Sequence, residues 1–75
     1  MGVSYKRLWK LLIDREMKKR DLKEAANLSP SLMSKLNQNK SVTTNTLVRI
    51  CTALNCRIED IMEIVPEEDL NHGDN

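Results

Sequence analysis

Apolar residues of this chain recur at steps of three and four, the spacing that gathers side chains on one face of an α-helix. No segment alternates apolar and polar residues over the length that marks a half-buried strand. The expected fold class is therefore all-α, a compact five-helix bundle with short turns. The spacing predicts these helices over residues 5–16, 20–26, 30–38, 44–54 and 58–65.

Polar residues at the ends of these segments support the boundaries. Ser29 can cap the third helix, because its hydroxyl precedes Pro30, and proline at the first helical position needs no amide partner. Thr43 or Thr44 can cap the fourth helix in the same way. Asparagine tolerates the left-handed backbone conformation that ends many helices. Three asparagines stand at predicted helix ends: Asn27, Asn39 and Asn55.

The length of 75 residues allows one small domain. A domain of this size buries only about 60% of the surface of its unfolded chain, so a deep substrate pocket is not expected. We expect residues 1–65 to form the folded domain, because Pro66 should end the last helix. Residues 66–75 are expected to form a flexible acidic tail, since they are rich in acids and poor in apolar residues.

Charge is distributed unevenly along the chain, although the net charge is only +1. Residues 1–40 carry ten basic and four acidic side chains, whereas residues 41–75 carry two basic and seven acidic ones. This polarity suggests that one side of the domain faces a polyanion. On charge alone, an equally good interpretation is that the basic residues of the first helix, Lys6, Arg7 and Lys10, form a solvated face.

Several classes of function are not supported by the sequence. The uncharged stretches are much shorter than the roughly 20 apolar residues of a membrane span, so no membrane partner is expected. Cys51, Cys56 and His72 cannot assemble a four-ligand zinc site, and free thiols in a reducing cytoplasm are expected instead. The predicted helices contain no histidine and no glycine-rich phosphate loop, so neither an enzyme nor a cofactor is expected.

The second and third predicted helices form the most informative pair. A short helix, an Asn-Leu-Ser turn and a capped second helix make a helix-turn-helix motif, in which the two axes cross at about 90° to 120°. Small residues, Ala25 and Ala26, would fit the narrow space where these helices cross. In this geometry the second helix of the motif can enter the major groove of DNA while the first crosses the backbone.

Further segments match a known family in the correct order. They are Leu-Trp-Lys-Leu-Leu-Ile-Asp at 8–14, Met-Lys-Lys-Arg-Asp-Leu at 17–22, Leu-Ser-Pro-Ser at 28–31, Lys-Leu-Asn at 35–37, Leu-Val-Arg-Ile-Cys-Thr-Ala-Leu-Asn-Cys at 47–56 and Asp-Ile-Met at 60–62. With these segments the chain resembles the Cro/cI-like, or lambda-repressor-like, helix-turn-helix domains of bacterial and phage transcriptional regulators. The resemblance implies a five-helix, sequence-specific regulator that binds double-stranded DNA as a homodimer, acts as a repressor and resides in the bacterial cytoplasm or nucleoid.

Carried over by position, the resemblance assigns the recognition helix to residues 30–38. The expected contacts to base edges are Ser31, Leu32, Ser34 and Lys35, and the expected contacts to the DNA backbone are Lys19, Asn39, Lys40, Ser41 and Thr43. Leu32 has an alternative role as a core residue, and Trp9 is expected in the core because it lies on the apolar stripe of the first helix. Many family members have glycine where this chain has Asn27 and Asn39, so the loop that meets phosphate can differ here.

Two questions of partnership stay open at the level of sequence. The fifth predicted helix, with Ile61, Ile64 and Val65, is the expected dimer contact, and the acidic C-terminal part is a candidate surface for a protein partner. The alternative to DNA binding is a helical protein-interaction module, such as an antitoxin-like or co-regulatory subunit. Replacement of Lys19, Lys35 and Lys40 without consequence would favour that alternative.

Overall fold

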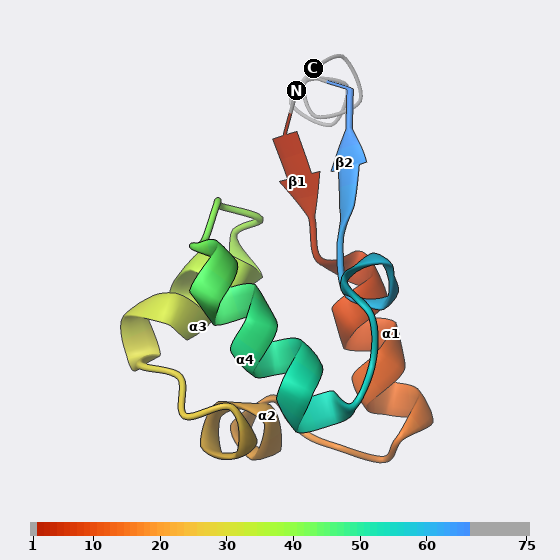
Figure 1. Cartoon of the computed structure of the whole chain (residues 1–75), viewed down its shortest axis with the longest axis vertical. Coiled ribbons are helices and arrows are strands. Elements are labelled where there is room, and N and C mark those ends of the chain that lie inside the picture. The colour runs from red at the N-terminus through yellow and green to blue at the C-terminus, as the bar shows by residue number, and fades with distance from the viewer. Residues whose placement is uncertain (1, 67–75) are drawn as a thin grey trace.

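The computed structural model describes residues 2–66, and the predicted acidic tail lies outside this range except for Pro66. Four α-helices and a small two-stranded sheet make up the described chain (Figure 1). The first four predicted helices are confirmed to within a few residues. The elements in chain order are β1 (Gly2–Ser4), α1 (Lys6–Asp14), α2 (Lys19–Ala25), α3 (Pro30–Asn37), α4 (Thr44–Leu54), the 3₁₀ turn η1 (Ile58–Asp60) and β2 (Glu63–Val65).

The predicted caps act at both helices where they were expected. The Ser29 hydroxyl accepts a hydrogen bond of 3.2 Å from the Leu32 amide at the start of α3. The Thr43 hydroxyl accepts one of the same length from the Thr46 amide at the start of α4. Because an unsatisfied amide at a helix start is costly, these side chains fix where the two helices begin.

Asparagine ends the helices as the sequence predicts. Asn27, Asn39 and Asn55 all have positive φ, between 51° and 55°. Glu16 also has positive φ, at 57°, although nothing in its side chain favours that conformation. Helix α2 lacks a hydroxyl cap, and there the carboxylate of Asp21 accepts a hydrogen bond of 2.8 Å from the Lys18 amide instead.

The predicted fifth helix over residues 58–65 is wrong, and so is the expectation of a fold without strands. The segment forms only the turn η1 and then β2, which pairs antiparallel with β1 in the register Gly2↔Val65, Val3↔Ile64 and Ser4↔Glu63. Two local features favour strand over helix: Ile64 and Val65 are β-branched, and Pro66 drives the preceding residue to extended backbone. The all-α five-helix bundle is therefore corrected to four helices with a two-stranded sheet.

One core joins all four helices with Ile61, which directly follows η1. Its buried residues are Tyr5, Leu8, Leu12, Leu22, Ala26, Leu28, Met33, Leu36, Leu47, Ile50, Leu54 and Ile61. Trp9 packs against this core from a partly buried position, in agreement with its place on the apolar stripe. Of the two alanines expected at the crossing of α2 and α3, Ala26 is buried and Ala25 is exposed.

Polar contacts fasten the two ends of α1 to distant parts of the chain. At its start, the amide of Tyr5 donates to Asn39 Oδ1 at 3.0 Å, and the Tyr5 hydroxyl donates to the Lys40 carbonyl at 2.7 Å. Burial raises the pKa of that hydroxyl above its usual value of 10.0. At the end of α1, the guanidinium of Arg15 donates to the carbonyl of Leu54 in α4.

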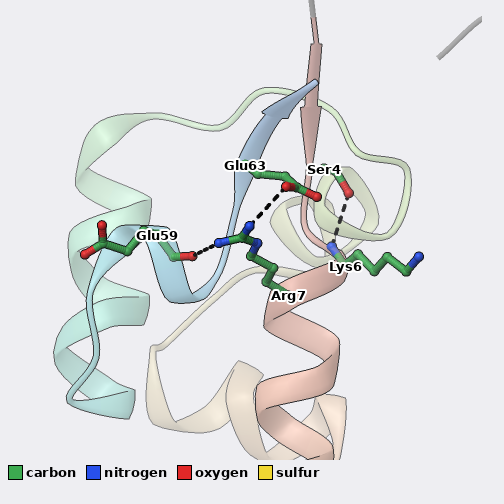
Figure 2. Close-up of polar contacts among 5 residues, drawn as sticks. All are labelled: Ser4, Lys6, Arg7, Glu59 and Glu63. Atoms are coloured by element: carbon green, nitrogen blue, oxygen red, sulfur yellow. Dashed lines mark hydrogen bonds and ion pairs between the residues drawn. The ribbon is translucent and has the colours of Figure 1, made fainter. Parts of the chain in front are cut away.

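The strand pair is fastened to α1 by one arginine. Figure 2 shows the guanidinium of Arg7 reaching from α1 to η1 and β2: it donates to the Glu59 carbonyl of η1 at 3.0 Å and to the Glu63 carboxylate of β2 at 3.3 Å. At the end of β1, the Ser4 hydroxyl accepts a hydrogen bond of 3.4 Å from the Lys6 amide. In Figure 1 the two strands project from the helical part as a separate arm.

Within residues 2–66, each helix falls short of the length and apolar content that a membrane-spanning helix requires.

Candidate nucleic-acid interface

Helices α2 and α3 and the turn between them form the predicted helix-turn-helix. Leu22 of α2, Ala26 directly after that helix, and Met33 and Leu36 of α3 belong to the common core, so the opposite side of α3 is turned outward. Arg49 of α4 holds the turn in place. Its guanidinium donates to the carbonyl of Ala26 at 3.3 Å and to that of Asn27. These two bonds satisfy carbonyls that the end of α2 leaves without helical partners.

The outward side of α3 carries the predicted base-contacting residues. Ser31 and Lys35 are four positions apart, which places them on one helix face, and both are exposed. Ser34 is exposed as well, and its hydroxyl accepts a hydrogen bond of 2.9 Å from the Gln38 side chain. Leu32 is half-buried and packs against the core, so only part of its side chain faces outward.

A cleft between α2 and α3, which we call the basic groove, has a volume of about 550 Å³. Its α2 side carries three cations, and its α3 side is formed in part by Met33, Ser34 and Asn37. Among the cations, Arg20 and Lys23 are functional candidates that our sequence interpretation missed. Their signal was present, since four basic residues lie within 18–23 at the beginning of α2. The three cations that line the groove are Lys19, Arg20 and Lys23.

Comparison with known proteins decides the family. The sequence matches the Cro/C1-type HTH DNA-binding domain over residues 7–67. The chain belongs to this family. The Cro/C1-type chain is also similar to the crystal structure of the transcriptional regulator VanUg (form II), with 52% sequence identity, a TM-score of 0.86 and coverage of 88% of each chain. Among curated proteins, no sequence matches it.

Family membership confirms the resemblance stated from the sequence, and it gives the class of protein to which the chain belongs. The protein is a DNA-binding regulator of the Cro/C1 type, a family that is not one of enzymes. The family match takes in nearly all of α1, the other three helices and β2, whereas β1 lies before its first matched residue.

The loop after α3 contains the remaining residues expected at the DNA backbone in this Cro/C1-type domain. Two of them already serve the fold: Asn39 Oδ1 accepts from the Tyr5 amide, and Thr43 Oγ1 accepts from the Thr46 amide. The side chains of Lys40 and Ser41 are exposed. Lys40 therefore presents the positive charge of this loop to solvent.

The expected dimer contact requires one correction. Ile61 is fully buried in the core of its own chain, because η1 folds it inward between α1 and α4. It cannot offer a surface to a second copy. Ile64, by contrast, is 65% exposed on β2, and Val65 is half-buried beside it.

The two cysteines are free thiols, each partly buried near the end of α4. Burial, and then the adjacent Cys51 thiol, raise the pKa of Cys56 to about 11. The raised pKa favours the neutral thiol of Cys56 over the thiolate at neutral pH. Among residues 2–66, no group of three potential metal ligands comes together.

Proposed function

We propose that this Cro/C1-type domain is a sequence-specific regulator of transcription that inserts α3 into the major groove of double-stranded DNA. The observation that carries the proposal is the outward face of α3, where exposed Ser31 and Lys35 stand beside the basic groove. A helix fits the major groove, which is about 12 Å wide. The similarity to VanUg, a transcriptional regulator, supports the regulatory role.

Base recognition falls to the first two turns of α3. The Lys35 ammonium can donate to guanine O6 and N7, and the Ser31 hydroxyl can bond a base or a phosphate. Leu32 offers its exposed part to a thymine methyl group. Ser34 lies at the edge of this set, because its hydroxyl is engaged with Gln38.

Backbone contacts on both sides of α3 fix its register on the duplex. Lys19 lies on one side in the basic groove, and Lys40 and Ser41 lie on the other in the loop. Asn39 and Thr43 also contribute to backbone binding. The Asn39 side-chain oxygen and the Thr43 hydroxyl oxygen accept bonds within the fold, so the side-chain N–H groups of Asn39 and the hydroxyl hydrogen of Thr43 are the groups offered to phosphate. These contacts supply affinity without base preference, and each neutralised phosphate makes binding more sensitive to salt.

The regulator acts as a homodimer on a two-fold operator. One small domain makes few phosphate contacts, and a second copy doubles them and sets the spacing of the half-sites. The exposed Ile64 and the adjacent Val65 on β2 are the proposed contact, without Ile61. A dimer bound over a promoter excludes other proteins from that DNA, which is the basis for a repressor role.

Binding to duplex DNA tests the proposal directly. Fluorescence anisotropy with a labelled random duplex at about 50 and about 200 mM salt should show a steep loss of affinity as salt rises. Selection from a random duplex pool should then enrich one sequence with two-fold symmetry. If the domain bound DNA at neither of the two salt concentrations, the proposal would be contradicted and a protein-interaction module would be favoured.

A further inference from the structure

The ammonium group of Lys19 is held by two side chains from other helices. Lys19 Nζ donates a hydrogen bond of 2.7 Å to Asn37 Oδ1, at the end of α3. The same nitrogen lies 4.2 Å from the centroid of the Trp9 ring, on α1. Because Lys19 is the first residue of α2, this single cation joins α1, α2 and α3.

We propose that Trp9 and Asn37 are positioning residues for phosphate binding: they hold the Lys19 ammonium at the basic groove before DNA arrives. The proposal rests on the DNA-binding function proposed above. It assigns a role to two residues that the resemblance did not include among the DNA contacts. Neither needs to touch the nucleic acid itself.

The chemistry of the two partners supports this role. Both are uncharged, so they orient the ammonium without neutralising it, whereas a carboxylate would compete with a phosphate for the charge. Within residues 2–66 the ion pairs are Arg7 with Glu63 and Arg57 with Glu59, and Lys19 takes part in neither. An ammonium has three N–H donors, and Asn37 occupies one of them. The group therefore keeps both its charge and its spare donors for a phosphate oxygen.

Pre-orientation matters because lysine has an especially flexible side chain. A freely rotating lysine gives up much of its rotamer freedom when it binds a phosphate, which reduces the affinity gained from the contact. Lys19 has already lost part of that freedom in the unbound domain. Lys23 provides the natural contrast: it lines the same groove, but within residues 2–66 it makes neither the hydrogen bond to Asn37 nor the cation–π contact with Trp9 that Lys19 makes.

The test is a double-mutant cycle measured as affinity for a random duplex. Asn37→Ala in the wild-type background should weaken binding about 2- to 10-fold, the equivalent of ordering one flexible side chain. The salt dependence should not change, because Lys19 still meets the phosphate. Lys19→Gln should lower the slope of log K against log salt by roughly 0.9, since one phosphate contact is lost. In the Lys19→Gln background, Asn37→Ala should have no further effect.

Lys23→Gln is the matched background for this cycle, because it removes a charge from the same groove. Asn37→Ala should keep its full effect there. Equal effects of Asn37→Ala in the wild-type and Lys19→Gln backgrounds, or no effect in either, would overturn the positioning role while leaving DNA binding intact. Failure of the wild-type domain to bind any duplex would overturn the proposed function and this inference together.

Trp9 gives an independent check that requires no DNA. It is the one tryptophan in the sequence, so its emission reports the environment of a single ring. Lys19→Gln should change that emission, because it removes the cation above the ring. Lys23→Gln should leave it unchanged. An identical spectrum for the wild type and Lys19→Gln would show that the contact does not form in solution, and the inference would fail.

Discussion

The helix-turn-helix and the strand pair of this domain are stabilised in different ways. The ends of α2 and α3 are set by neighbours in the sequence, such as Ser29 before α3 and Asn27 after α2. The strands are joined by contacts between residues about 60 positions apart, such as the pairing of Gly2 with Val65. The helix-turn-helix is thus specified locally, and the strand pair depends on the completed tertiary structure.

The two regions also differ in how their cations are paired. The basic groove gathers cations from α2, and its one fixed cation is held by uncharged partners. At the strand pair, by contrast, the cation Arg7 is matched with the carboxylate of Glu63. A cation paired with a carboxylate stabilises the fold, whereas an unneutralised cation remains available to a polyanion. The following substitutions test this division, from the largest expected effect to the smallest.

Ile61→Ala should have the largest effect, because Ile61 anchors the end of the chain to the core. We expect a loss of about 2–5 kcal/mol in the free energy of unfolding, measured by chemical denaturation, since the change removes buried methyl groups and leaves a cavity. Ile64→Ala is the matched control and should change monomer stability little, because Ile64 is exposed. If size-exclusion chromatography of Ile64→Ala showed the same dimer as the wild type, the proposed β2 contact would be wrong.

Lys35→Ala should remove one contact to a base pair, and the loss in binding free energy should be smaller than the loss in stability expected for Ile61→Ala. Affinity for the selected operator should fall by about 1–3 kcal/mol, the value of one good contact to a base pair, as measured by anisotropy. Affinity for random duplex should fall much less. Lys10→Ala removes a charge from exposed α1 and serves as the control. Equal losses on both duplexes for Lys35→Ala would mean that Lys35 contacts only phosphate.

Ser29→Ala should lower the free energy of unfolding by about 1 kcal/mol, because α3 loses its cap. Thermal denaturation followed by circular dichroism measures this change. Ser31→Ala is the matched control: the same atom is removed two positions away, where it caps nothing. The local specification of α3 would be refuted if Ser31→Ala destabilised the domain as much as Ser29→Ala.

Glu63→Gln should have the smallest effect, about 0.2–1 kcal/mol, because exposed ion pairs contribute little. The loss in unfolding free energy should shrink in high salt, where the wild-type pair is screened. Affinity for DNA should stay the same, since Glu63 lines no part of the basic groove and is not one of the proposed dimer contacts, Ile64 and Val65. Glu59→Gln is the comparison variant: it removes the longer ion pair with Arg57, at 3.7 Å, and keeps the bond from Arg7 to the Glu59 carbonyl, so its effect on stability should be no larger. A marked change in DNA affinity for Glu63→Gln would show that the two regions are coupled.

The difference between the regions also explains what the sequence could predict. A helix cap is visible in four or five consecutive residues, so the start of α3 at Pro30 and of α4 at Thr44 could be placed correctly. The strand β2 has three residues, which is too short for an alternating pattern, and its partner lies at the opposite end of the chain. The apolar spacing at Ile58, Ile61 and Met62 fits a helix as well as it fits the turn that forms.

The candidate site could be predicted in part, because two of its residues lie within one helix. Ser31 and Lys35 follow from the helical period of α3 once its start is known. The contact between Lys19 and Asn37 depends on how α2 crosses α3, and its contact with Trp9 depends on how α1 packs beside them. Such contacts between helices require the three-dimensional arrangement, because no spacing within one helix reveals them.

The antiparallel register of the strand pair has a mechanical consequence. Gly2 and Val65 form the outermost pair, and Ser4 and Glu63 form the innermost one, next to the helices. Tension applied across residues 2 and 65 would peel the pairs apart one at a time and reach the Arg7 contact last. A force that pulls residues 2 and 65 apart would therefore open the strand pair before it reached the four helices.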